Sequence, residues 1–163
     1  MKFSALLDTS FLISLTDKNR PTHEIAKQYY KYMIEQNITM YLSSIVVSEF
    51  CIKQPITDLP LRNFQFLPFN IPDGIESANI YNLLGNIKSD DSRTVVRNDL
   101  KIIAQALKVN IPVIFTDDFR TFYKDCERLS TSGKNIKAIV LKYGFDSSQL
   151  RLDGQKDIED VIN

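Results

Sequence analysis

Two apolar segments of the sequence each end in carboxylates. In FSALLD, Asp8 follows an apolar run that starts at residue 3, and in IPVIFTDDF, Asp117 and Asp118 follow the run at 111–116. If both segments are strands of one parallel sheet, their carboxyl ends meet at one edge, which is where such sheets bind ligands. The spacing therefore predicts that these acids lie together.

Two further acids belong to the same set of candidates. Glu49 lies in the otherwise apolar helical segment SSIVVSEF, and Asp99 begins the helical segment NDLKIIAQAL. Each has a simpler explanation, because Glu49 could pair with Lys53 at i+4 and Asp99 could interact with the helix dipole. The acids at the strand ends could likewise cap the helices that follow them. Structural roles are therefore open for every acid taken singly.

Taken together, four carboxylates at one sheet edge are harder to explain by structure alone. They would repel one another and raise each other's pKa values, and a divalent cation would relieve that repulsion. Oxygen-only ligands suit Mg²⁺ or Mn²⁺. Such an ion can activate water and stabilise charge on a phosphodiester during its hydrolysis. The residue types predict this chemistry but do not specify a nucleic acid.

Short apolar strands alternate with amphipathic helices along the whole chain, which predicts a parallel sheet covered on both faces. Pro68 places the third strand at an edge of that sheet. The expected strands are 3–7, 38–42, 64–69, 112–116 and 136–142, and the expected helices are 10–17, 22–36, 44–53, about 73–86, 98–108 and about 119–130.

Composition limits the class of protein. The chain has 163 residues, of which 44% are hydrophobic, and this suits one domain with a substantial core. Lysine plus arginine and aspartate plus glutamate both number 20, so a nucleic acid would have to be held by a local basic patch. Cys51 and Cys126 lack metal-type spacing and are expected in helices as small apolar residues. Because no apolar run approaches the roughly 20 residues of a membrane helix, we predict a soluble cytoplasmic protein.

The segments LLDTSFL, SSIVVSEF, RNDLKIIAQAL and IFTDDF resemble, in order and surroundings, the four acidic motifs of PIN domains. The resemblance covers residues 3–142. It implies a three-layer α/β/α sandwich with a central parallel sheet of about five strands in the order 3-2-1-4-5. PIN domains are metal-dependent ribonucleases, best known in bacteria as toxins of type II toxin–antitoxin pairs. Residues 1–142 would then form the nuclease domain, and 143–163 a polar tail of the same domain.

Residue by residue, the resemblance implies catalytic and metal-binding roles for four acids, with Asp117 as a further metal ligand. Supporting hydroxyls would come from Thr9 or Ser10 and from Thr116. We expect RNA to contact Arg120 and Lys124, which lie on one stripe of the helix after the fourth motif, and Arg97 beside the third. The segment before that third motif departs from the family by adding Asp90 and Asp91. The four acids to which the resemblance assigns these roles are Asp8, Glu49, Asp99 and Asp118.

The leading prediction is an endoribonuclease that uses Mg²⁺ or Mn²⁺, cuts RNA and is neutralised by a small antitoxin. The aromatic-rich segments KQYYKYM and EFCIK also predict apolar contacts, and therefore a homodimer. One alternative is a PIN-like scaffold without catalysis, and another is a receiver-like signalling domain, although that needs an acidic pair near the first strand. A haloacid-dehalogenase-like phosphatase is disfavoured because Ser10 stands where its second aspartate is required.

Overall fold

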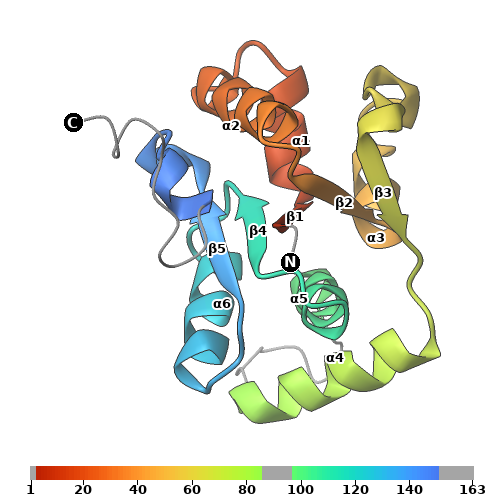
Figure 1. Ribbon diagram of the computed structural model, residues 1–163. Helices are drawn as coiled ribbons and strands as arrows, with labels where there is room; N and C mark the ends of the chain where they lie inside the picture. The colour runs from red at the N-terminus through yellow and green to blue at the C-terminus, as the bar shows by residue number, and fades with distance from the viewer. Residues whose placement is uncertain (1–2, 86–96, 151–163) are drawn as a thin grey trace.

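The computed structural model describes residues 3–85 and 97–150. Its five strands form one parallel sheet in the order β3-β2-β1-β4-β5 (Figure 1), which confirms the predicted α/β class and strand order. The strands are β1 (Ser4–Leu7), β2 (Thr39–Ser43), β3 (Phe64–Leu67), β4 (Val113–Thr116) and β5 (Lys137–Val140).

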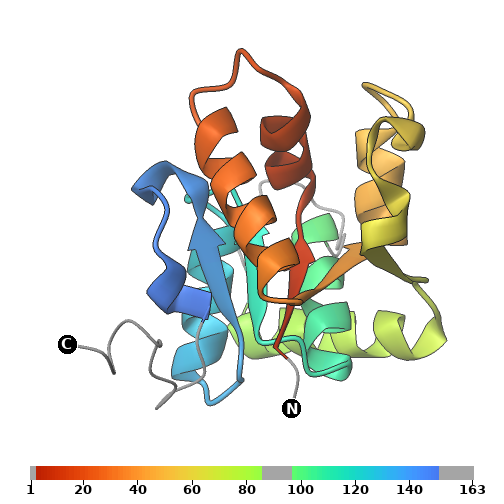
Figure 2. The ribbon, with the colours of Figure 1, turned by 45° about the horizontal axis from the view of Figure 1, so that its top comes forward.

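Helices cover both faces of this sheet. Helices α1 and α2 pack together on one face, and α4, α5 and α6 lie on the other, as Figures 1 and 2 show from two directions. Helix α3 follows β2 and contacts both α1 and α5. The helices are α1 (Thr9–Thr16), α2 (His23–Glu35), α3 (Ser44–Phe50), α4 (Ile71–Leu84), α5 (Asn98–Lys108) and α6 (Phe122–Thr131).

The central strands are buried on both faces, and their composition explains why. Three consecutive residues of β1 are fully buried: Ala5, Leu6 and Leu7. A parallel strand that is covered on both sides needs apolar residues at consecutive positions. At the edge strand β3, by contrast, Phe66 is 51% exposed. Pro68 directly follows that strand, in agreement with the predicted edge position.

Strand register decides which residues leave the sheet side by side. Leu7 of β1 pairs with Phe115 of β4, and Thr116 of β4 pairs with Val140 of β5. The residues that follow these three strands therefore emerge next to one another at the carboxyl edge of the sheet. We call this region the acidic edge, because Asp8 and Asp118 are among those residues.

Several element boundaries differ from the sequence-based prediction. Helix α3 ends at Phe50, so Lys53 lies outside it, and α6 begins at Phe122 rather than at 119. Cys126 is buried in α6 as expected, but Cys51 is exposed just after α3, and the apolar role predicted for Cys51 is wrong.

The chain after β5 continues into two short 3-10 turns, η3 (Leu141–Tyr143) and η4 (Ser147–Leu150). Leu150 is buried against the core. The unusual acids Asp90 and Asp91 and the remainder of the predicted tail lie outside the described residues. Within the described ranges, no helix has the length and apolar character needed to cross a membrane.

Candidate functional site

Asp8 joins the ends of β1 and β4. It is the N-cap of α1, and its backbone N–H donates to the Phe115 carbonyl oxygen at 2.9 Å. The carboxylate accepts hydrogen bonds from Ser10 Oγ at 2.7 Å and from Thr116 Oγ1 at 3.0 Å. Only 7% of the residue is exposed. Burial raises the pKa of Asp8, while the hydrogen bonds from the two hydroxyl groups work in the opposite direction.

Asp118 lies in the turn that links β4 to α6. Its Oδ1 accepts from the backbone N–H groups of Arg120 and Thr121 at 2.8 and 3.1 Å, and its Oδ2 accepts from Thr121 Oγ1 at 2.6 Å. Burial raises the pKa of this carboxyl, but the hydrogen bonds outweigh burial and leave the pKa below its usual value. The same Thr121 hydroxyl lies 3.4 Å from Asp99 Oδ2, so it stands between the two carboxylates.

Asp99, in the first turn of α5, has a pKa raised to about 6. Burial is the main cause, and repulsion from Asp8 is the second. Asp118 and Asp125 raise the pKa further, whereas the positive charge of Arg97 lowers it. These effects show that Asp8, Asp99 and Asp118 are near enough to interact electrostatically.

Glu49 is tied to the same edge by two neutral groups. Thr9 Oγ1 donates to Glu49 Oε2 at 2.5 Å, and Asn98 Nδ2 donates to Glu49 Oε1 at 2.7 Å. Thr9 directly follows Asp8 and Asn98 directly precedes Asp99, so Glu49 connects the beginnings of α1 and α5. The i+4 pair with Lys53 does not form, because α3 has ended before that residue.

The four predicted acids would offer a metal ion only oxygen ligands, and the repulsion between their negative charges favours binding of a hard divalent cation. Within residues 3–85 and 97–150, however, no three histidine, cysteine, aspartate or glutamate side chains are grouped so that they could hold one metal ion. The four predicted acids are instead connected through hydroxyl and amide groups from the neighbouring positions. A shared metal site therefore stays a prediction.

Asp117 points to a different region. Its carboxylate accepts from Thr22 Oγ1 at 2.9 Å, and Thr22 in turn lies 2.9 Å from Ser14 Oγ in a buried hydroxyl pair. The backbone N–H of Asp117 donates to Ser10 Oγ at 2.8 Å. These bonds join the residue after β4 to α1 and to the start of α2. The geometry therefore favours Asp118, rather than Asp117, as the companion of Asp99.

The three predicted RNA-binding cations differ in their surroundings. Arg120, beside Asp118, and Lys124 on α6 are exposed. Arg97 forms an ion pair with Asp125, a carboxylate that is only 4% exposed. Its guanidinium therefore neutralises a buried acid next to Asp99.

Sequence reasoning missed three residues of the site: Asn98, Thr121 and Asp125. Asn98 was signalled only by its place beside Asp99, and Thr121 only by its three-residue spacing from Asp118, which is typical of a side chain that closes a turn.

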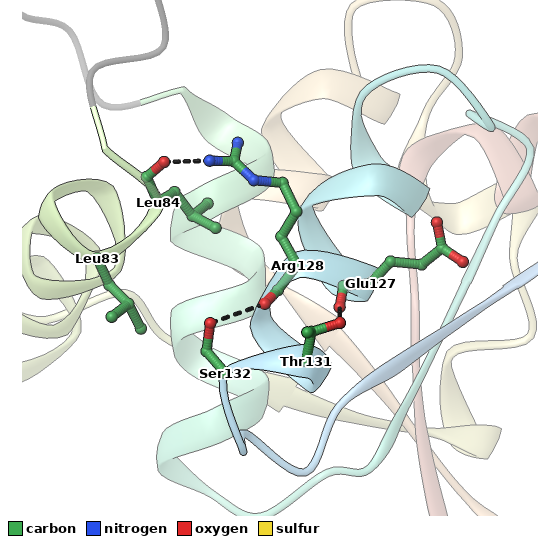
Figure 3. Close-up of a pocket in the computed structure, with 6 residues that line it drawn as sticks. All are labelled: Leu83, Leu84, Glu127, Arg128, Thr131 and Ser132. Carbon is green, nitrogen blue, oxygen red and sulfur yellow. Dashed lines mark hydrogen bonds between the residues drawn. The ribbon is translucent and has the colours of Figure 1, made fainter.

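A cavity of about 500 Å³ lies away from this edge, between the end of α4 and the second half of α6 (Figure 3). The guanidinium of Arg128 donates to the Leu84 carbonyl oxygen there, which satisfies an orphan acceptor at the end of α4. None of the four predicted acids lines this cavity. Its walls are Leu83, Leu84, Glu127, Arg128, Thr131 and Ser132.

The family profile described as PIN domain matches residues 5–125, which confirms the resemblance seen in the sequence. Among curated protein sequences, none matches the chain at a significant level.

Solved structures with the same fold come from several bacteria. FitAcB from Neisseria gonorrhoeae has a TM-score of 0.60 and 17% identity, with 85% of this chain and 99% of that chain covered. VapBC2 from Rickettsia felis, bound to a DNA fragment from its promoter, has a TM-score of 0.57 and 15% identity over 85% and 98%. VapC20 from Mycobacterium tuberculosis, a Sarcin-Ricin loop cleaving toxin, has a TM-score of 0.53 and 15% identity over 80% and 95%.

Proposed function

Because the chain belongs to the PIN domain family, we propose that it is a divalent-metal-dependent endoribonuclease that hydrolyses RNA phosphodiesters. The observation that carries the proposal is the placement of Asp99 at the carboxyl edge of the sheet, where Thr121 Oγ1 lies within 3.4 Å of both Asp99 and Asp118 and where the charges of Asp8 and Asp118 help to raise the pKa of Asp99 to about 6. A metal-dependent ribonuclease needs carboxylates grouped in this way to bind a divalent ion near a phosphate. Structural carboxylates have no comparable need to face one another.

Each acid has a defined part in the proposed site. Asp8, Asp99 and Asp118 would bind Mg²⁺ or Mn²⁺, with Glu49 as the fourth acid, and Ser10 and Thr116 hold the Asp8 carboxylate in place. When bound, such an ion lowers the pKa of water and offsets charge that develops on the phosphate. Thr9 orients Glu49 through its 2.5 Å hydrogen bond. Thr121 holds Asp118 in the same way.

The substrate and protein partners are part of the same proposal. Arg120 and Lys124 would contact RNA phosphates, and Arg97 would do so from its place beside Asp125. FitAcB, VapBC2 and VapC20 share this fold, and VapC20 is a toxin that cleaves the Sarcin-Ricin loop. By analogy, this chain would be the toxin of a cytoplasmic toxin–antitoxin pair and would bind a small antitoxin protein.

Homodimer formation also stays a prediction. Two aromatic residues from the segments that suggested it, Tyr29 and Phe50, are buried in the core, whereas Ile52 is 82% exposed. A monomeric mass at micromolar concentration, with no small protein co-purifying from the native cell, would count against both kinds of partner.

The test of the activity is cleavage of single-stranded RNA by the purified protein. We expect cleavage with added Mg²⁺ or Mn²⁺, and none in EDTA. The change Asp8→Asn should lower the rate by at least about 100-fold, because the amide keeps the size of the side chain but removes the charge. The matched control is Asp58→Asn, at an exposed aspartate in a surface turn, which should cleave like the wild type. Equal rates for the wild type and Asp8→Asn would mean that the acidic edge does not catalyse the cleavage, which favours the non-catalytic scaffold.

The fourth acid can be assigned by comparing Asp117→Asn with Asp118→Asn under the same conditions. We expect Asp118→Asn to lower the cleavage rate by about 10- to 100-fold. Asp117→Asn should have a smaller effect, because the carboxylate of Asp117 bonds to Thr22 and away from Asp99. The reverse order would reassign the fourth position to Asp117.

A further inference from the structure

Two exposed aromatic rings and two cations lie next to the acidic edge. Phe119 and Arg120 directly follow Asp118, and Lys142 and Tyr143 belong to η3, which directly follows β5. Because the last residues of β4 and β5 are paired in register, these two segments leave the sheet at adjacent positions. We call Phe119, Arg120, Lys142 and Tyr143 the aromatic surface.

The cations of the aromatic surface contact the rings. Lys142 Nζ lies 3.0 Å from the centroid of the Phe119 ring and 5.1 Å from that of Tyr143. The guanidinium carbon of Arg120 lies 5.6 Å from the Phe119 centroid. Cation–π attraction of this kind holds a lysine between two rings and fixes how they are presented. The surface is therefore an ordered arrangement rather than a set of unrelated side chains.

Packing does not account for these rings. Tyr143 is 65% exposed and Phe119 is 38% exposed, in contrast to Phe115 and Phe122, which flank the same loop and are buried in the core. A large ring left in water next to a proposed catalytic centre is a feature typical of ligand contact.

In the described part of the chain, the two cations of the aromatic surface also lack a carboxylate partner. Within the described residues, neither Lys142 nor Arg120 forms an ion pair with a carboxylate. The acid nearest to Arg120 along the chain, Asp118, accepts hydrogen bonds from Thr121 Oγ1 and from backbone N–H groups. The surface thus offers positive charge beside exposed ring faces, although the chain as a whole has a net charge of zero.

We propose that the aromatic surface binds an unpaired segment of RNA, with a base stacked on Tyr143 and the adjacent phosphates held by Lys142 and Arg120. Exposed rings interleaved with cations are the pattern with which proteins hold single-stranded nucleic acid, since every base has a face that can stack. An acidic protein partner would need the cations but not the free ring faces, so RNA accounts for more of the observations.

This inference rests on the proposed ribonuclease function and adds to it a surface that would hold the RNA. Stacking does not read the hydrogen-bonding edges of bases, and phosphate contacts carry no sequence information. The aromatic surface would therefore select unpaired over double-stranded RNA without fixing a base sequence. The aromatic surface would hold the nucleotide next to the phosphate that the proposed catalytic site would bind at Asp118 and Asp99.

The test is binding of a fluorescently labelled oligouridine to the full chain in EDTA, where cleavage is blocked, measured by anisotropy. We expect Tyr143→Leu to weaken binding on the order of 10-fold, and Tyr143→Trp to retain it, because tryptophan keeps a stacking face. Lys142→Met should weaken binding and also lower the dependence of log K on log salt by about one, whereas Tyr143→Leu should leave that slope unchanged. The matched control is Phe66→Leu, which changes an exposed phenylalanine on the far strand β3 and should bind like the wild type.

The outcomes separate this inference from the proposed function. If the wild type cleaves RNA while Tyr143→Leu and Lys142→Met bind and cleave normally, the aromatic surface is not an RNA site and belongs to a protein contact or to solvent. Equal binding of a duplex and of the single strand would also overturn the inference. If Tyr143→Leu loses binding but the wild type cleaves no RNA with Mg²⁺ or Mn²⁺, the proposed catalysis fails and the RNA-binding surface stands.

Discussion

Buried carboxylates occur in two kinds of surroundings in this molecule. Asp73 and Asp125, which are 2% and 4% exposed, form ion pairs with Lys108 and Arg97 respectively. Asp8 is 7% exposed, yet in the described part of the chain its carboxylate is met only by hydroxyl and backbone N–H groups. Where the fold itself needs a buried carboxylate, the chain supplies the cation. At the acidic edge it does not, so the negative charge there serves something other than stability.

The ion pair of Asp73 has a structural role. Asp73 and Asn70 form a reciprocal capping box at the start of α4, and Lys108, at the end of α5, reaches the same carboxylate. The three residues therefore fasten α4 to α5 on one face of the sheet. Asp8 also caps a helix, α1, but within residues 3–85 and 97–150 no cation is paired with it.

The largest expected effect follows from breaking the structural pair. Lys108→Met should lower the free energy of unfolding by about 2 kcal/mol, because it leaves the buried Asp73 carboxylate without its cation. The loss is moderate because Lys108 itself is one-third exposed to water. Urea denaturation measures the loss. The control is Lys27→Met, which breaks the exposed pair with Glu24 and should cost less than about 0.5 kcal/mol. Equal losses for the two variants would remove the distinction between the two classes of carboxylate.

The same measurement on the acidic edge should give the opposite sign. Asp8→Asn should raise the free energy of unfolding by about 1 kcal/mol in EDTA at pH 7, because burial opposes the charge of Asp8 and Asp99 repels it. Asparagine caps helices as well as aspartate does, so α1 should not be affected. A loss of stability would mean that the bonds from Ser10 and Thr116 outweigh the cost of the charge.

A smaller effect, and one that depends on pH, is expected at Asp99. Its pKa is about 6 in the folded chain and about 3.9 when unfolded, so the folded state binds more protons between these values. Its contribution to stability therefore falls as the pH rises from about 4 to about 6. Asp99→Asn should gain less than about 1 kcal/mol over the wild type at pH 7, allowing for solvent screening at this half-buried site.

Thermal unfolding in EDTA, measured at pH 7 and at pH 4, checks this prediction. The variant should unfold above the wild type by less than about 4 °C at pH 7, and at nearly the same temperature at pH 4. A constant difference at both pH values would show that the effect does not come from the titration of Asp99.

The fold was predictable because its signals are local. Each strand is a short apolar run, each helix carries an apolar stripe, and the acids that end the first and fourth strands mark the edge where they meet. Helix ends were harder to predict. Glu49 and Lys53 have the right spacing for an ion pair, but only on a helix that continues past Phe50.

The partners of the acids were not predictable in the same way. Because α6 begins at Phe122, the residues before it form a turn in which Thr121 and backbone N–H groups surround Asp118. The pair of Arg97 and Asp125 spans 28 positions and two helices, so no local pattern indicates it. Such contacts depend on how whole helices pack, which periodicity does not specify.

The aromatic surface illustrates the same limit. The last strand was expected to reach residue 142, which would have placed Lys142 inside the sheet and left Tyr143 in a polar tail. β5 instead ends at Val140, and the next three residues form the 3-10 turn η3. The strand therefore ends two residues earlier than expected, and Lys142 lies over the ring of Phe119, the residue after Asp118.

The position of β1 in the middle of the sheet has a consequence for how the protein is made. β1 is synthesised before β4, and Thr116, which donates a hydrogen bond to Asp8 at the acidic edge, lies 108 positions after Asp8. Contacts between such distant segments form slowly, since a long loop must close before they contribute. A chain from which β4 has not yet emerged therefore has β1 with one side unpaired, and its Asp8 has the Ser10 hydroxyl but not that of Thr116. Under the proposed function, the chain would become able to cut RNA only after β4 has emerged, and a prematurely terminated chain would be harmless.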